Sequence, residues 1–211
     1  MEVALPLSRR QTLAGLVSLA LVAPAAAQGL NLAELGSPGP LGDKMLGSDK
    51  APVTIIEYAS VTCQYCAIFH AEVYPKLKAK FIDTGKMRFI FREFPTGPAN
   101  ASIAGFMLAR CSGDKYFPLV EAMMEQQRSW IEKPYDGLLR IARQAGMSQE
   151  AFETCLKDRK LAEEIGNTAR RASEKFGVES TPTFFVNGVK IVGAQPLAVF
   201  EKAIEAQLKT N

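Results

Sequence analysis

The chain has 211 residues, of which 47% are hydrophobic and 22% are charged. This balance can bury a full core, and it excludes both a largely disordered chain and a mostly membrane-embedded one. The formal net charge is +3, and the lysines and arginines are scattered among nearly as many acids. Because no basic stripe is present, the charge pattern gives no indication of a nucleic-acid partner or an anionic membrane surface. The length predicts one domain, or one domain with a large insertion.

The N-terminus has the pattern of a secretory signal peptide. The pair Arg9-Arg10 precedes an apolar run over residues 13–22, and three alanines ending at Ala27 follow. The run is shorter than the roughly 20 residues that span a bilayer, so a retained membrane anchor is the less favoured alternative. We expect a signal peptide over residues 1–27, cleaved after about Ala27, and a mature protein in the oxidising periplasm, where disulfides persist. The arginine pair leaves the general secretory and twin-arginine routes both open.

The first half of the mature chain predicts a strand, a helix and a second strand. Residues 28–50 are rich in Gly and Pro and lack a helical or strand period, so we expect an extended N-terminal segment. Residues 53–58 are mostly β-branched and aromatic and predict a central strand. A helical period then runs over residues 63–81, and residues 87–91 predict the second strand. This order forms a βαβ unit, whose two strands are expected to be parallel.

Residues 95–176 predict a series of helices, broken at glycines and a proline. Asn100 and Ser148 are candidate N-caps of two of them. Asn100 also begins a triplet that matches a glycosylation sequon, but we favour the cap because such triplets arise often by chance. The last helix of the series is expected to end at Gly177.

The chain ends with a predicted hairpin and a helix. Asn187-Gly188 is flanked by two short apolar segments, residues 183–186 and 189–192. This dipeptide between two strands is a strong signal for a β-hairpin. A final helix is expected over residues 197–208, so the mature chain forms a βαβ half, a helical insertion and a ββα half.

The motif Cys63-Gln64-Tyr65-Cys66 lies where the first strand gives way to the helix. Two cysteines three residues apart at a helix start can form a disulfide, and the positive end of the helix dipole favours a thiolate at Cys63. Cys63 then fits the attacking thiol and Cys66 the resolving thiol of thiol-disulfide exchange. An inert disulfide is a weaker alternative, because so short a loop restricts little chain entropy. A zinc site is also weaker, since the chain has no second CxxC motif and only one histidine.

Together with Thr181-Pro182 before the hairpin, this architecture resembles the thioredoxin superfamily, and within it the DsbA-like thiol:disulfide oxidoreductases. Three stretches carry the resemblance: Ile55-Ile56-Glu57-Tyr58 through the CxxC motif, Arg92-Glu93-Phe94-Pro95, and Ser180 through Gly188. It implies an α/β thioredoxin fold over residues 51–94 and 177–211, with a helical domain inserted at 95–176.

The resemblance also implies roles for residues outside the motif. Pro182 is similar to the family's cis-proline, which presents the backbone of Thr181 to an extended substrate; an ordinary trans proline is the alternative. Glu57 matches an acid that relays protons to the resolving cysteine, with a solvated or ion-paired glutamate as the alternative. His70 lies one helical turn after Cys66 and could tune the thiols, although a simply hydrogen-bonded histidine is the favoured alternative.

Cys111 and Cys155 lie on the apolar faces of two predicted helices. If Cys63 pairs with Cys66, a Cys111–Cys155 bridge is the remaining connectivity, and it would stabilise the fold by about 4 kcal/mol in the chain-entropy model. Two buried free thiols are the alternative.

These features predict an exported, monomeric oxidoreductase that donates its Cys63–Cys66 disulfide to reduced or unfolded secreted proteins, without a cofactor or metal. The resemblance implies a quinone-linked membrane protein as the reoxidation partner. A disulfide isomerase or reductase of the same fold is one alternative, and a protein that binds a soft metal or holds unfolded clients is another. Gln64-Tyr65 departs from the Pro-His dipeptide of the best-known strongly oxidising member and carries no cation. We therefore expect a less stabilised thiolate and a less oxidising protein.

Overall fold

The computed structural model describes residues 1, 2 and 30–210. Apart from its first two residues, the predicted signal peptide, with its arginine pair and cleavage site, lies outside the described residues. Within the described part of the chain, every helix is too short or too polar to cross a membrane.

A five-stranded sheet with the order β1-β3-β2-β4-β5 forms the centre of the fold. The central strand β2 (Val53–Ala59) lies parallel to β3 (Met87–Glu93) and antiparallel to β4 (Thr183–Val186). Strand β5 (Val189–Val192) pairs with β4, and β1 (Lys44–Leu46) pairs antiparallel with β3. The predicted βαβ unit and terminal hairpin are confirmed, and with them the α/β thioredoxin fold.

The hairpin between β4 and β5 turns at the expected dipeptide. Asn187 has φ 44° and Gly188 has φ 91°, the two positive values that a type I′ turn requires. Asn187 also binds the centre of the sheet, because its Oδ1 accepts the backbone N–H of Thr54 at 2.8 Å. The turn therefore fixes the register of β4 beside β2.

The helix predicted over residues 63–81 is broken. It forms α2 (Gln64–Glu72), α3 (Tyr74–Leu77) and the π-helical turn η1 (Lys78–Ile82). Pro75 explains the break, because proline has no N–H to donate and its ring clashes with the carbonyl four residues earlier. The chain then turns at Gly85 into β3.

The N-terminal segment expected to be extended over residues 28–50 contains a helix and a strand, so that expectation was wrong. Helix α1 (Leu32–Gly36) begins at Asn31, whose side chain accepts the backbone N–H of Glu34. Arg92 of β3 holds this segment in place, because it donates to both carboxylate oxygens of Asp43 and to the backbone oxygen of Leu35. These contacts join residues about fifty positions apart, so no local period signals them.

Helices fill the chain between β3 and β4. They are α4 (Ala99–Cys111), the 3-10 turn η2 (Gly113–Lys115), α5 (Tyr116–Glu125), α6 (Gln127–Ile131), α7 (Pro134–Gln144), α8 (Gln149–Leu156) and α9 (Arg159–Phe176). Ser148 caps α8 as predicted, because its hydroxyl accepts the N–H of Ala151. The prediction that Asn100 caps a helix was wrong: α4 already begins at Ala99, after Pro98. Gly177 ends α9 in the left-handed conformation, as expected.

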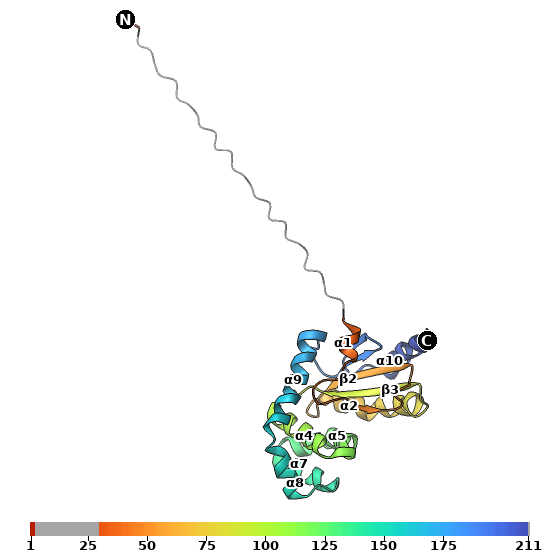
Figure 1. The fold of residues 1–211 in the computed structure, drawn as a ribbon, viewed down its shortest axis with the longest axis vertical. Coiled ribbons are helices and arrows are strands. Elements are labelled where there is room, and N and C mark those ends of the chain that lie inside the picture. The colour runs from red at the N-terminus through yellow and green to blue at the C-terminus, as the bar shows by residue number, and fades with distance from the viewer. Residues whose placement is uncertain (3–29, 211) are drawn as a thin grey trace.

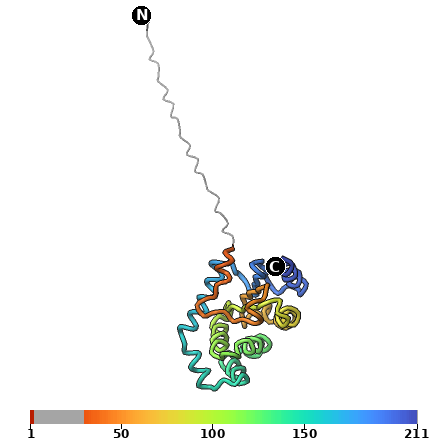
Figure 2. Tube along the Cα trace, turned by 45° about the vertical axis from the view of Figure 1, so that its right-hand side comes forward, coloured from red at the N-terminus to blue at the C-terminus, as the bar shows by residue number. Residues whose placement is uncertain are grey.

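The two faces of the sheet are covered by different helices (Figure 1). One face packs against α2, α3 and α10 (Leu197–Leu208), and its core continues into the helices α4 to α8. On the other face, Leu35 of α1 and Phe176 of α9 pack on Ile56 and Tyr58 of β2. The helices α4 to α8 gather at one end of the molecule, and α9 runs back from them to the sheet (Figures 1 and 2).

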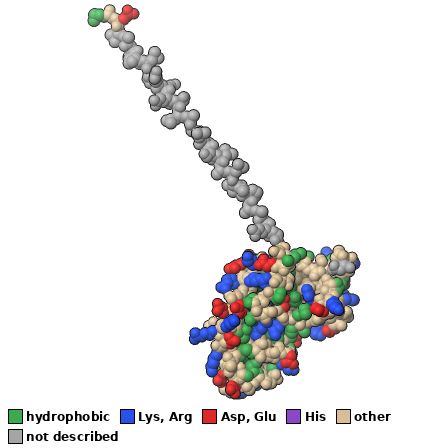
Figure 3. All heavy atoms as spheres, in the orientation of Figure 1, with side chains coloured by type: hydrophobic (Ala, Val, Ile, Leu, Met, Phe, Trp, Pro, Cys, Tyr) green, Lys and Arg blue, Asp and Glu red, His purple; other side chains and the backbone are tan. Residues whose placement is uncertain are grey.

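The surface of the described residues mixes both signs of charge. On the face shown in Figure 3, basic and acidic side chains alternate with apolar ones. This distribution agrees with the even charge pattern of the sequence.

Candidate active site

Cys63 lies at the N-terminal end of α2, where it takes the N-cap position in extended backbone with φ −84° and ψ 118°. Its backbone N–H donates to the oxygen of Ser60 at 3.1 Å, and its own oxygen accepts the N–H of Ala67 at 3.1 Å. The strand β2 thus passes through a tight turn directly into the helix, which places the partly exposed Cys63 thiol at the positive end of the helix dipole.

Cys66 lies one turn further along α2 and is buried, with 0% of its surface exposed. Its Sγ accepts the backbone N–H of Ser60 at 3.5 Å. Burial is the main cause that raises the pKa of Cys66 well above its ordinary value, and the charge of Glu57 adds to the rise. Both Cys63 and Cys66 are free thiols in the structure.

Hydrogen bonds lower the pKa of Cys63 from 9.0 to about 6. The thiol of Cys66 makes the largest contribution, and the Thr181 side chain and the backbone N–H groups of Cys66 and Tyr65 add to it, while partial burial opposes them. These are hydrogen-bond donors and not a cationic side chain, which fits the absence of a cation at Gln64-Tyr65 in the sequence. At neutral pH, Cys63 is mainly a thiolate and Cys66 a thiol.

The loop before β4 meets the N-terminus of α2. The Thr181–Pro182 peptide bond is cis, and the Cys63 thiol lies 3.3 Å from the backbone oxygen of Thr181, to which it can donate. Next to this contact, the backbone N–H of Gly193 donates to the oxygen of Pro182 at 2.8 Å. The structure therefore brings Thr181 and Pro182 to Cys63, as the resemblance implied.

Glu57 and His70 form a buried pair behind Cys66. The Nε2 atom of His70 lies 2.9 Å from Oε2 of Glu57, and the two side chains are 6% and 0% exposed. Strand alternation turns Glu57 toward the α2 face of the sheet, and the four-residue spacing from Cys66 places His70 on the same face of the helix. Sequence patterns singled out both residues, but not their contact with each other.

Gln127 is a residue of the site that sequence reasoning missed. It is 8% exposed, and its Nε2 donates to the backbone oxygens of Val61 at 2.8 Å and Cys63 at 3.0 Å. It comes from α6, so a helix between the two sheet halves holds the loop that carries Cys63. No local signal marks it, because a glutamine in a helical stretch normally faces solvent.

A hydroxyl cluster supports the same loop from the other side. The Ser60 hydroxyl lies 2.9 Å from that of Thr62 and 2.8 Å from that of Ser102 on α4. It also accepts the backbone N–H of Thr96 at 3.2 Å. The turn that orients the CxxC motif is therefore tied to the helices on both sides.

Cys111 and Cys155 are joined by a disulfide between the end of α4 and the end of α8. The bridge lies within the helical group and links residues 44 positions apart. The structure thus agrees with the connectivity favoured from the sequence over two free thiols.

Arg92 and Glu93 do not pair with each other, although both belong to β3. Arg92 pairs with Asp43, whereas Glu93 accepts from Arg110 at 2.5 and 2.8 Å and from the Tyr116 hydroxyl at 2.8 Å. These contacts fasten the N-terminal segment and the helical group to the edge of the sheet.

The part of the chain that the structure describes contains no cluster of three or more His, Cys, Asp or Glu that could hold a metal ion. His70 is engaged by Glu57 and not by the two thiols.

Known proteins are similar to this chain in sequence. A family profile described as thioredoxin matches residues 41–206. A Rickettsia typhi protein assigned as a protein-disulfide oxidoreductase is 36% identical over 155 residues, which cover 70% of this chain and 56% of that protein. The chain thus spans little more than half the length of this relative. The disulfide bond formation protein D of Bacillus subtilis is 26% identical over 189 residues, covering 85% of this chain and 83% of that protein.

A solved structure adds to these similarities. The crystal structure of Wolbachia pipientis alpha-DsbA1 matches with a TM-score of 0.78 and 37% identity, and the match covers 85% of this chain and 97% of that one. The family profile spans the residues from before Cys63 to beyond Pro182, so the similarity includes the whole site. The chain belongs to the thioredoxin superfamily, and within it to the DsbA-like thiol:disulfide oxidoreductases.

Proposed function

We propose that the protein is an exported thiol:disulfide oxidoreductase that transfers its Cys63–Cys66 disulfide to reduced cysteines of secreted proteins. One observation carries the proposal: a partly exposed thiol with a pKa of about 6 lies beside a buried thiol whose pKa is raised. This asymmetry gives one good leaving thiolate and one thiol that retains its proton. An inert structural disulfide needs neither property.

The exchange runs in two steps. A client thiolate attacks Sγ of Cys63, the Cys63–Cys66 bond breaks, and Cys66 leaves with the electron pair and takes up a proton. A second client thiolate then attacks the client sulfur of the mixed disulfide and releases Cys63 as a thiolate. The client loses two electrons and gains a disulfide, and the protein ends as a dithiol. The lowered pKa of Cys63 favours its release in the second step.

The loop at Thr181-Pro182 would position the client. Its backbone lies beside Cys63, and pairing with an extended client through main-chain groups would accept many sequences. Tyr65 and Ile68 expose 55% and 43% of their surfaces on the same helix, which offers apolar contact to unfolded chains. Glu57 would relay a proton to Cys66, since it lies near enough for its charge to act on that thiol.

Two observations support a periplasmic location, and the chemistry of the cycle supports a partner protein that reoxidises the dithiol. The N-terminal sequence has the signal-peptide pattern, and relatives carry names that refer to disulfide formation. Each catalytic cycle leaves the protein reduced, so a quinone-linked membrane protein would reoxidise it. We expect a monomer, and no cofactor or metal is needed for the exchange.

A trapping experiment tests the proposal. The Cys66→Ala variant is first loaded at Cys63 with a thionitrobenzoate mixed disulfide. The thiolate of a single-cysteine version of the unfolded test protein then attacks Sγ of Cys63 and displaces thionitrobenzoate. The covalent complex should accumulate, because neither protein has a second thiol that resolves it, and dithiothreitol should release it. The Cys63→Ala variant should trap nothing. Equal trapping by both variants, or unchanged oxidation of the test protein by Cys63→Ala, would refute the proposal.

A disulfide isomerase or reductase of the same fold is the second candidate. The observation that favours it is the absence of a cation at Gln64-Tyr65, because a less stabilised thiolate makes a disulfide less oxidising. The redox potential of the Cys63–Cys66 pair, measured at equilibrium with glutathione, distinguishes a disulfide donor from an isomerase or reductase.

A further inference from the structure

A pocket of about 490 Å³ opens between α2 and α5, next to the buried pair of Glu57 and His70. His70, Tyr74 and Lys78 line it from one side, and Glu121 and Glu125 line it from α5. Solvent in this pocket therefore reaches the edge of the Glu57–His70 pair at His70. Cys66 itself has no such contact, because it is completely buried.

Three buried polar atoms around the pair have no hydrogen-bond partner among the described residues: Oε1 of Glu57, Nδ1 of His70 and the hydroxyl of Tyr74. Buried polar groups are nearly always satisfied, so three neighbouring exceptions call for a functional explanation. The contact between Glu57 and His70 uses one oxygen of the carboxylate and one nitrogen of the ring. Oε1 of Glu57 and Nδ1 of His70 therefore each remain available for a further hydrogen bond or a proton transfer.

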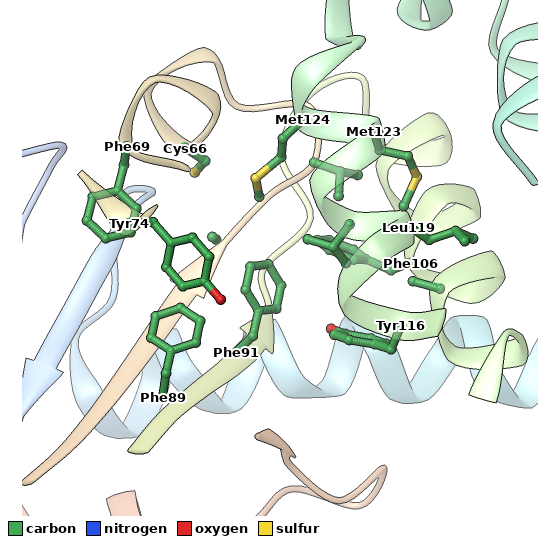
Figure 4. Close-up of a cluster of buried hydrophobic side chains, with 14 of the residues drawn as sticks. Cys66, Phe69, Tyr74, Phe89, Phe91, Phe106, Tyr116, Leu119, Met123 and Met124 are labelled. Carbon is green, nitrogen blue, oxygen red and sulfur yellow. The ribbon is translucent and has the colours of Figure 1, made fainter. Parts of the chain in front are cut away.

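Tyr74 borders the pair without titrating in the neutral range, because burial raises its pKa. The rings of Tyr74 and His70 lie 4.8 Å apart. In Figure 4, Tyr74 lies among Phe69, Phe89 and Phe91 with its hydroxyl directed toward the sheet. Of the described residues that line the pocket, His70 is the one that hydrogen-bonds to Glu57.

Exchange requires proton movement at this point. When the Cys63–Cys66 bond breaks, the electron pair stays on Sγ of Cys66, and a buried thiolate there is unstable without a proton. Glu57 lies on the same face of the sheet as Cys66, and it is itself 0% exposed. A proton that Glu57 gives to Cys66 must therefore be replaced through a neighbour.

We propose that His70 is a positioning residue that holds Glu57 through Nε2 and connects it to the pocket between α2 and α5, so that Cys66 exchanges its proton with solvent along this path. The inference rests on the proposed function and names a further residue for it. During reduction, one proton passes from the Glu57–His70 pair to Sγ of Cys66, and the pair regains one proton from the pocket. During reoxidation, the proton moves in the opposite direction.

The charged and titratable groups that face His70 come from four elements. They are Glu57 from β2, Tyr74 from α3, Lys78 from η1, and Glu121 and Glu125 from α5. Glu121, Glu125 and Lys78 line the pocket, whereas Glu57 hydrogen-bonds directly to His70. Substitutions at His70 therefore test the path itself.

The test measures single-turnover reduction of the Cys63–Cys66 disulfide by excess dithiothreitol from pH 5 to pH 8.5, with acid quench and thiol counting. We expect His70→Gln, which keeps a hydrogen bond but not a base, to slow reduction by about tenfold or more and to change the shape of the pH profile. Glu57→Gln should do the same, and the double variant should be no slower than Glu57→Gln alone. Glu72→Gln, on the exposed side of α2, is the matched control.

Chemical rescue separates a proton path from a packing role. His70→Ala extends the pocket toward Glu57, so added imidazole should restore the rate, whereas pyrazole, of the same size but much weaker as a base, should not. A rate unchanged in His70→Gln, additive effects in the double variant, or equal rescue by both compounds would overturn the proposal.

A second test uses the unmodified protein, so its result does not depend on whether a variant folds. His70 is the only histidine in the chain, so one set of imidazole ¹⁵N signals reports its state. We expect these signals to differ between the oxidised and reduced proteins at the same pH, and identical signals would contradict the inference. A small dithiol is the reductant, so failure here leaves the proposed transfer to secreted clients untouched, and that transfer is tested separately by trapping.

Discussion

The thiol of Cys63 lies 3.3 Å from the backbone oxygen of Thr181, a residue 118 positions later in the chain. This contact joins the N-terminal end of α2 to the loop before β4. In the sequence, the helices α3 to α9 lie between these two segments. The chemistry of Cys63 thus depends on two separate segments, and each can be tested.

The rate of alkylation of Cys63 by iodoacetamide should follow its thiolate fraction. With a pKa of about 6, the rate should be half-maximal near pH 6, fall below it and reach a plateau above it. Thr181→Val removes one of the hydrogen bonds that lower the pKa, so its midpoint should move to higher pH. A midpoint near the ordinary value of 9.0 in the unmodified protein would contradict the described site.

The stability of the reduced protein should depend on pH through the same group. The pKa of Cys63 is lowered in the folded state, so its contribution is complete above the unfolded value of 9.0 and is lost as the pH falls through about 6. Between pH 6 and pH 8.5, the free energy of unfolding of the reduced protein should therefore rise relative to that of Cys63→Ala. Cys66 stays protonated in the folded state over this window, since burial raises its pKa, and both proteins contain it. Urea unfolding at pH 5, 7 and 8.5 measures the difference, and parallel curves for the two proteins would exclude the linkage.

Replacing Gln64-Tyr65 with Pro-His should strengthen the thiolate. A protonated histidine beside Cys63 adds the cation that the natural dipeptide lacks, and proline preorganises the first helical turn. The alkylation midpoint should move below pH 6 by about one pH unit. Tyr65→Phe is the matched control, because it keeps the ring and adds no charge. An unchanged midpoint in the Pro-His variant would show that the dipeptide does not set the pKa.

Removing the Cys111–Cys155 bridge should weaken the fold without abolishing exchange. The bridge closes a long loop between α4 and α8, so the Cys111→Ser, Cys155→Ser double variant should lose about 4 kcal/mol of unfolding free energy in the chain-entropy model. Its alkylation midpoint at Cys63 should not move. Denaturation monitored by circular dichroism gives the first value, and a loss below about 1 kcal/mol would count against a stabilising role.

Local patterns in the sequence were sufficient for much of this fold. Asn187-Gly188 predicted the hairpin because the turn needs two positive φ angles, and the position of Cys63 at a helix start followed from the change of hydrophobic period. Ser148 and Gly177 marked helix ends through hydrogen bonding and backbone conformation that act within a few residues.

Long-range contacts were beyond those patterns. Arg92 holds helix α1 and Asp43, the residue before strand β1, and Gln127 holds the loop of Cys63. Each contact joins residues about fifty positions or more apart. The contact of Glu57 with His70 depends on how α2 lies on the sheet, which neither residue's own segment determines. Pro75 could have signalled the break in the helix, whereas Asn100 was misleading because α4 begins one residue before it.

The equilibrium between the Cys63–Cys66 pair and glutathione tests the central claim most directly. The fraction of dithiol is measured by alkylation and mass across a series of glutathione ratios at pH 7. A protein that donates disulfides should have a potential above thioredoxin's value of about −270 mV, and below the roughly −120 mV of the strongly oxidising Pro-His member. A potential at or below about −270 mV would contradict the account and make the protein a reductase.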